Sequence, residues 1–137
     1  MKLQNKVALI TGSSKGIGKA IALKYASEGA NIAINYNSDY KGAQQVLAEV
    51  LKFGVKAITV GADVSKEEDC KRLIETTVKE LGGLDILVNN AGIVFDKEWN
   101  TKTYKDWNQT LNTNLVGPFI LSREASEHLK KSGEGRV

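Results

Sequence analysis

The sequence contains one cysteine, one histidine and one proline, and these scarcities exclude several classes of protein. A single cysteine cannot form an internal disulfide, so Cys70 is predicted to be an inert structural thiol. No cluster of His, Cys, Asp and Glu has the spacing of metal ligands, so no metal site is expected. The apolar runs, such as Ile86-Leu87-Val88, are far too short to span a bilayer.

An excess of charge of either sign is also missing. The 19 Lys and Arg residues are interspersed among 16 Asp and Glu residues, so no basic block favours nucleic acid or an anionic membrane. No signal peptide is visible before the first apolar run at Val7, and the cytoplasm is the predicted location. A length of 137 residues fits one domain, residues 1–137.

Short apolar segments alternate with amphipathic ones along the whole chain. We expect strands at residues 7–10, 30–35, 55–60 and 84–89. We expect helices that close at Gly29, over residues 39–53, from Ser65 to Leu81 and over residues 104–131. This alternation predicts an α/β fold with a Rossmann-like, doubly wound parallel sheet that binds ligands at the carboxyl ends of its strands.

Two local signals refine the predicted helices. Ser65-Lys66-Glu67-Glu68 has the pattern of a capping box and predicts that a helix starts there. Pro118 lies inside the last long helix, where it removes one backbone donor, so we expect it to kink that helix or to pack in a special way.

The glycine-rich segment Thr11–Gly18 lies between the first strand and the first helix. A strand, a tight turn and a helix N-terminus in this order form an anion site, because backbone N–H groups and the helix dipole favour phosphate. The spacing does not match a P-loop, since Ser13 stands where the first glycine is required and Ala20 follows Lys19. A nucleotide cofactor of the dinucleotide type is therefore predicted.

Four motifs in the expected order resemble the short-chain dehydrogenase/reductase family. The glycine turn Thr11–Gly18 is joined by Asp63-Val64 after the third strand and by Asn89-Asn90-Ala91-Gly92 after the fourth. Trp107 and Asn112-Thr113-Asn114-Leu115-x-Gly117 are similar to the helix that carries the family's asparagine. The chain looks most like the 3-oxoacyl-[acyl-carrier-protein] reductases, which implies a part in fatty acid biosynthesis and a carbonyl or acyl-thioester substrate. Within the resemblance, acyl-carrier-protein thioesters, sugars and steroids all stay open as substrates.

The resemblance implies roles for three groups of residues. The glycine turn would wrap the phosphates and the adenosine ribose, with Gly18 allowing the helix to pack closely on the sheet. Asp63 and Val64 would hold the adenine, and Asn90, Ala91 and Gly92 would line the ribose beside the nicotinamide. With the end of the second strand, the predicted cofactor-binding residues are Gly12, Ser13, Ser14, Lys15, Gly16, Ile17, Gly18, Tyr36, Asn37, Ser38, Asp63, Val64, Asn90, Ala91 and Gly92.

The end of the second strand favours NADP over NAD. An NAD enzyme of this fold has Asp or Glu there to bind the ribose 2′-hydroxyl, whereas this chain has Tyr36-Asn37-Ser38. Lys15 could supply a cation to a 2′-phosphate. Asp39 lies one residue past the expected contact and weakens this argument slightly.

The catalytic set of the family is incomplete in this sequence. Carbonyl reduction in the family needs a Tyr followed four residues later by a Lys, and none of the four tyrosines has one. Of that set only Asn114 is present. Because Gly133–Val137 resembles the start of a fifth strand, the chain is interpreted as the N-terminal half of a reductase and is expected to be inactive alone. A silent dinucleotide-binding module and an interaction piece remain as alternatives.

The last helix is also predicted to mediate assembly. With β-pairing ending at the fourth strand, part of the surface formed by Leu111, Leu115, Phe119 and Ile120 would be uncovered, and a homo-oligomer is expected through this helix. Trp99, Trp107 and Phe119 are interpreted as packing residues, and His128 as a solvated surface residue.

Overall fold

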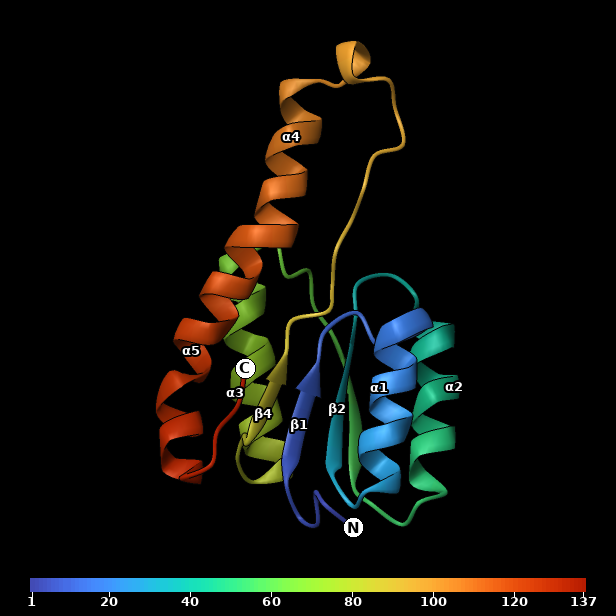
Figure 1. Ribbon diagram of the computed structural model, residues 1–137, viewed down its shortest axis with the longest axis vertical. Helices are drawn as coiled ribbons and strands as arrows, with labels where there is room; N and C mark the ends of the chain where they lie inside the picture. The colour runs from blue at the N-terminus through green and yellow to red at the C-terminus, as the bar shows by residue number, and fades with distance from the viewer.

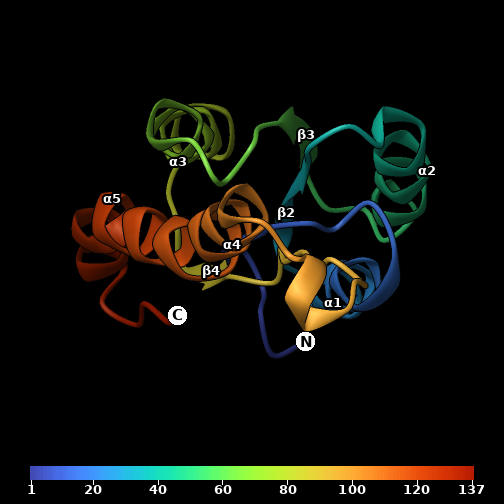
Figure 2. The same cartoon turned by 90° about the horizontal axis from the view of Figure 1, so that it is seen from above.

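Four parallel strands form one sheet in the order β3-β2-β1-β4, in a computed structural model that describes all residues 1–137. Helices α1 and α2 cover one face, and α3 and α5 cover the other (Figures 1 and 2). The predicted α/β fold with a doubly wound parallel sheet is therefore confirmed. The elements are β1 Val7–Ile10, α1 Gly16–Ser27, β2 Asn31–Tyr36, α2 Tyr40–Leu51, β3 Ala57–Gly61, α3 Glu67–Leu81, β4 Ile86–Val88, a 3₁₀ turn Trp99–Thr101, α4 Tyr104–Leu111, a π-helical turn Asn112–Val116 and α5 Gly117–Ser132.

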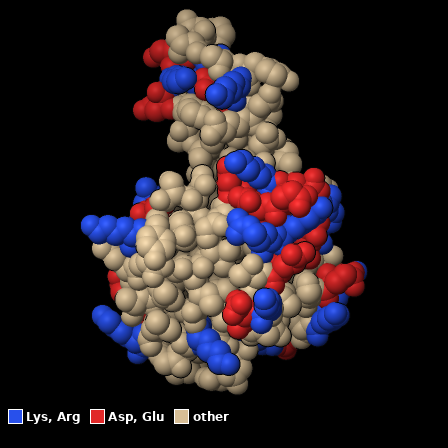
Figure 3. Space-filling view, turned by 180° about the vertical axis from the view of Figure 1, so that it is seen from behind, with Lys and Arg blue, Asp and Glu red and all other residues tan.

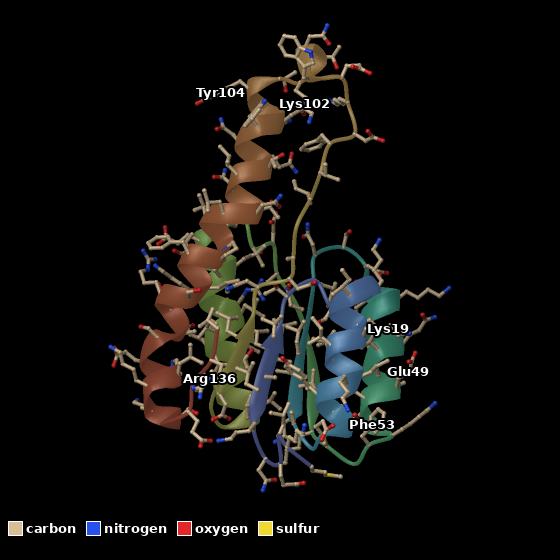
Figure 4. The ribbon with its side chains drawn as sticks, viewed as in Figure 1. Lys19, Glu49, Phe53, Lys102, Tyr104 and Arg136 are labelled. Atoms are coloured by element: carbon tan, nitrogen blue, oxygen red, sulfur yellow. The ribbon has the colours of Figure 1, made fainter.

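The central strand β1 is buried on both faces, as a parallel strand between two helical layers must be. Ala8 and Ile10 pack in the core between the sheet and α1 and α2. Leu9 packs in the opposite core against α3 and α5. Between α1 and α2, Lys19 and Glu49 form an ion pair at 2.8 Å at the edge of this packing (Figure 4).

The start of α3 differs from the prediction of a capping box. Lys66, not Ser65, is the residue before the helix, and its side chain caps nothing. The Ser65 hydroxyl donates instead to the Asp63 carboxylate at 2.6 Å, which fixes the loop before the helix. No side chain caps the helix, but the carboxylates of its first turn, Glu67–Asp69, interact favourably with the positive end of the helix dipole.

The predicted helix over residues 104–131 is present, and it contains a π-helical turn just before Pro118. The π-helical turn lies between α4 and α5, and Pro118 stands in the first turn of α5 directly after it, so the helical hydrogen-bond pattern changes where a kink or special packing was expected. Residues from Val94 through α4 form an arm that extends beyond the carboxyl ends of the strands (Figure 1). A capping box between Thr103 and Asp106 and an ion pair from Lys97 to Asp106 at 2.9 Å hold the tip of this arm.

The packing predicted for the aromatic residues of this region is wrong for this chain. Trp99, Trp107 and Phe119 are 83%, 60% and 60% exposed. Leu111 and Leu115 are also exposed, as predicted. Ile120 is instead buried against the core, because it lies one residue beyond the Leu111–Leu115–Phe119 face and turns toward the sheet.

The last residues of the chain lie beside β4, as Figure 4 shows for Arg136. Arg136 forms a parallel bridge with Ile86, in which the Leu87 N–H donates to the Arg136 carbonyl at 3.0 Å and the Arg136 N–H donates to the Asp85 carbonyl at 2.9 Å. The Asp85 carboxylate accepts from the Val7 N–H at 2.7 Å and from the Ser132 hydroxyl. The expected strand pairing of Gly133–Val137 thus begins at Arg136.

Three surface and core features bear on the remaining expectations. No helix combines the length and apolar character that crossing a membrane requires. Positive and negative side chains are mixed over α3 and α5 and form no field of one sign (Figure 3). Cys70 is buried, and burial raises the pKa of its thiol to about 11, which agrees with an inert thiol.

Candidate functional site

One pocket lies at the carboxyl ends of the four strands, between the sheet and the arm. Its volume is about 330 Å³. The loops after β1, β2, β3 and β4 all contribute to its wall, as do α4 and the π-helical turn that follows it. The lining residues are Gly12, Ser14, Lys15, Asn35, Asn37, Ala62, Asp63, Val64, Ser65, Asn90, Ala91, Gly92, Ile93, Gln109 and Thr113.

The glycine loop is held from inside by Ser13. Gly12 has a φ of +59°, a conformation that only glycine adopts readily, and it turns the chain sharply after β1. The Ser13 side chain is buried, where its hydroxyl donates to the Ile10 carbonyl at 2.7 Å and its N–H donates to the Asn35 carbonyl at 2.9 Å. Ser14 and Lys15 are left on the side of the pocket.

Gly18 lies where the first turn of α1 touches the rest of the site. A Cβ atom at this position would lie 2.5 Å from the Gly12 carbonyl oxygen and 2.5 Å from Asn90 Nδ2. Real Cβ atoms do not approach other atoms so closely, so the helix start can pack here only because the residue is glycine. Close packing was predicted for Gly18 against the sheet, and the structure places it against the glycine loop and the loop after β4.

Asn35 was not predicted, yet its side chain joins the carboxyl ends of three strands, β1, β2 and β3, at the site. Its side chain is buried, and Oδ1 accepts from the Gly12 N–H at 3.1 Å. Nδ2 donates to the carbonyls of Val60 at 3.2 Å and Ala62 at 3.1 Å. A polar residue near the end of an otherwise apolar strand run was the one signal in the sequence that could have revealed it.

Asn90 and Thr11 tie the loop after β4 to the glycine loop. Asn90 Nδ2 donates to the carbonyls of Thr11 at 2.9 Å and Gly12 at 3.0 Å. The Thr11 hydroxyl in turn accepts from the N–H groups of Asn90 at 3.0 Å and Ala91 at 2.9 Å. The four hydrogen bonds make these two loops a single wall of the pocket.

Asp63 and Val64 present a matched acceptor and donor to the pocket. One carboxylate oxygen of Asp63 accepts from the N–H and the hydroxyl of Ser65, at 3.0 and 2.6 Å. The other oxygen accepts no hydrogen bond, and the neighbouring Val64 N–H donates none within the chain. An acceptor next to a donor is complementary to the amino group and ring nitrogen of adenine, so these residues fit the base of a nucleotide.

The structure brings nine of the fifteen predicted cofactor-binding residues to the pocket wall: Gly12, Ser14, Lys15, Asn37, Asp63, Val64, Asn90, Ala91 and Gly92. The remaining six do not line it: Ser13, Gly16, Ile17, Gly18, Tyr36 and Ser38. Tyr36 packs over Gly61, and its ring forms a T-shaped pair with that of Tyr40, with 5.9 Å between the ring centroids. The lining residues that were not predicted are Asn35, Ala62, Ser65, Ile93, Gln109 and Thr113.

Asn114, the predicted catalytic residue, lies on the π-helical turn and holds the backbone of Ile93. Its Oδ1 accepts from the Ile93 N–H at 2.8 Å, and its Nδ2 donates to the Ile93 carbonyl at 2.8 Å. Its side chain does not line the pocket, but Ile93 does. In this structure Asn114 fixes the loop from which the arm departs.

Comparison with known proteins identifies one family over nearly the whole chain. A family model described as short chain dehydrogenase matches residues 6–137. General stress protein 39 of Bacillus subtilis (strain 168) is 46% identical over 130 residues, which cover 94% of this chain and 46% of that protein. Glucose 1-dehydrogenase 2 of the same organism is 40% identical over 131 residues, covering 95% and 51%. The chain thus spans about half the length of the curated relatives it matches.

Solved structures share the fold closely. A short chain dehydrogenase from Burkholderia cenocepacia J2315 in complex with NADP superposes with a TM-score of 0.92 at 40% identity. That match covers 94% of this chain and 53% of the other. A short-chain dehydrogenase/reductase from Serratia marcescens BCRC 10948 superposes with a TM-score of 0.90 at 35% identity, covering 94% and 53%.

Proposed function

Since this chain belongs to the short chain dehydrogenase family, we propose that residues 1–137 form one dinucleotide-binding domain, the cofactor-binding half of an NADP-dependent carbonyl oxidoreductase. The observation that carries the proposal is the shared pocket of the glycine loop, Asp63-Val64 and Asn90–Gly92. When bound, NADPH would supply the hydride for reduction of a ketone.

Different residues of the chain bind different parts of the cofactor. The backbone of the glycine loop and the start of α1 favour the phosphates. The free carboxylate oxygen of Asp63 and the N–H of Val64 bind the adenine edge. Asn90 holds the glycine loop in place by donating directly to the Thr11 and Gly12 carbonyls, so this wall is already formed before binding.

The polar residues after β2 support NADP over NAD. Asn37 lines the pocket, and no carboxylate occupies that part of the wall. Asp39, the nearest acid, caps α2 by accepting from the Gly42 N–H at 3.0 Å. The exposed Lys15 lines the pocket and forms no ion pair within the chain, so it can approach a 2′-phosphate. The NADP complex of the B. cenocepacia relative agrees with this choice.

A charge reversal at Lys15 tests the cofactor preference. We expect Lys15→Glu to weaken NADPH binding at least about 10-fold and NADH binding less than about 2-fold, because only NADPH carries the 2′-phosphate. Isothermal titration of both cofactors measures the two affinities. Lys52→Glu makes the same change of charge at the exposed C-terminal end of α2 and should leave both unchanged.

Equal losses for NADPH and NADH, or tighter binding of NADH by the unchanged chain, would contradict the preference.

With a 3-oxoacyl thioester added, the same NADPH solution should show no oxidation of cofactor, since no Tyr here is followed by Lys four residues later. The 3-oxoacyl-[acyl-carrier-protein] reductase type and its place in fatty acid biosynthesis remain proposals, because the relatives named above are a stress protein and a glucose dehydrogenase. Binding without turnover is also what a silent dinucleotide-binding fragment would show.

We also propose that the exposed face of Leu111, Leu115 and Phe119 joins copies of the chain, since a contiguous apolar face tends to associate. Light scattering at micromolar concentration should find a dimer or larger assembly. Leu115→Glu should shift it to the monomer, whereas Lys131→Glu, a charge change at the far end of α5, should not. A monomeric unchanged chain would contradict the proposal.

A further inference from the structure

A second cavity lies at the opposite end of the sheet from the dinucleotide pocket, beside the amino ends of β1 and β4. Its volume is about 450 Å³, against about 330 Å³ for the pocket at the carboxyl ends. The last turns of α3 and α5 form its sides, because both helices run back along the sheet and end where the strands begin (Figure 1). The two cavities share no lining residue, so the proposed function makes no use of the second one.

The floor of this cavity is apolar. Val7 and Leu84 are buried, and Val78 and Leu81 of α3 are partly buried beside them. A Cβ atom on Gly83, which also lines the cavity, would have no neighbour within 4 Å, so open space lies next to the main chain here. Because burial of apolar surface is worth about 25 cal/mol per Å², such a floor favours a ligand with a hydrocarbon part.

The α5 side of the cavity carries a positive charge that has no partner in the chain. Lys131 is exposed and forms no ion pair, and His128, half-buried about one turn earlier, forms no hydrogen bond. Asp85 is the only acid among the lining residues. Its two carboxylate oxygens already accept from the Val7 N–H at 2.7 Å and from the Ser132 hydroxyl. The charge of Lys131 is therefore left for a ligand.

Two backbone donors of the lining are also unpaired. The N–H groups of Gly83 and Leu84 donate no hydrogen bond within the chain, whereas the Gly82 N–H closes α3 by donating to the Val78 carbonyl at 2.9 Å. Gly82 is left-handed, with a φ of +89°, and successive N–H groups beside such a residue form a concavity that binds anions. Basic residues in the last turns of α3 and α5 offset the negative ends of the two helix dipoles.

We propose that this cavity is a second binding site, and that its ligand is a medium-chain aliphatic carboxylate. The hydrocarbon part packs on the apolar floor, and the carboxylate binds Lys131 and the N–H groups of Gly83 and Leu84. The volume lies within the range of about 300–1,000 Å³ that is usual for sites of small organic molecules. The inference is independent of the proposed function, because the two sites lie at opposite ends of the sheet.

Isothermal titration with octanoate tests the proposal. We expect one saturable site, and we expect Lys131→Gln to weaken octanoate binding at least about 5-fold, because a charge-assisted contact is lost. Butyrate, with four fewer methylene groups, should bind the unchanged chain at least about 10-fold more weakly than octanoate. Lys130→Gln is the matched control and should bind octanoate normally, since Lys130 pairs with Glu127 at 2.9 Å and does not line the cavity.

Nuclear magnetic resonance locates the octanoate. The amide resonances of Gly83 and Leu84 should shift on its addition, and saturating NADPH should change its affinity less than about 2-fold. Displacement of octanoate by NADPH would place it in the dinucleotide pocket and overturn the inference. Equal affinities for Lys131→Gln and the unchanged chain, or no saturable binding below about 10 mM, would overturn it as well. A chain that binds octanoate but not NADPH would refute only the proposed function.

Discussion

Gly18→Ala is expected to weaken NADPH binding at least about 10-fold and to destabilise the fold by about 1–3 kcal/mol. The added Cβ would lie 2.5 Å from the Gly12 carbonyl oxygen, a backbone atom that cannot turn aside as the end of a side chain can. Relief of the contact requires α1 to move away from the glycine loop. Because Asn90 Nδ2 also lies 2.5 Å from the added atom, the same movement disturbs the loop after β4.

Titration with NADPH and chemical unfolding in urea measure the two effects of Gly18→Ala. Gly83→Ala is the matched control, since Gly83 has no positive φ and a Cβ there would have no neighbour within 4 Å. The control should bind and unfold like the unchanged chain. Equal behaviour of the two variants would show that Gly18 does not limit the packing of α1.

Asn35→Leu is expected to cost about 3–5 kcal/mol of the free energy of unfolding. The leucine removes the partner of the Gly12 N–H and of the Val60 and Ala62 carbonyls, and each polar group left unpaired in the interior costs about 1–3 kcal/mol. A domain of this size is typically stable by about 5–15 kcal/mol, so much of the fold's stability depends on this one carboxamide.

Urea unfolding followed by circular dichroism measures the loss. Asn37→Ala provides the control two residues away, because Asn37 is exposed and its side chain forms no hydrogen bond within the chain. A change below about 0.5 kcal/mol is expected for the control. If Asn35→Leu were equally mild, the carboxyl ends of β1, β2 and β3 would have to be held together by backbone contacts alone.

The order of strands and helices could be predicted from the sequence because its signals are local. Gly54 and Gly82, both with positive φ, follow α2 and α3 as the pattern indicated. The pocket wall was found through motifs that follow strand ends, since the carboxyl ends of parallel strands meet at one edge of a sheet. Nine of the predicted residues reach that wall for this reason.

Contacts between distant segments could not be predicted in the same way. Asn35 bonds across 23 residues to Gly12 and across 27 to Ala62, and no spacing rule specifies those partners. The capping pattern at Ser65 failed because the helix starts one residue later than the pattern indicated, with Lys66 before Glu67, while the Ser65 hydroxyl donates to the Asp63 carboxylate. Only part of the Leu111–Ile120 surface was expected to be uncovered, and packing against the core decides which part: Ile120 is buried there, whereas Leu111, Leu115 and Phe119 are exposed.

The two hydrogen bonds between Asn114 and Ile93 fix the point from which the arm departs. The carboxamide donates to and accepts from one residue's backbone, as a neighbouring strand would. Five residues after the end of β4, a helix side chain thus pairs with the backbone of one loop residue. Because Gln109 and Asn114 lie on the same helical run, this pair of hydrogen bonds also couples the position of Ile93 to the Gln109 side of the pocket.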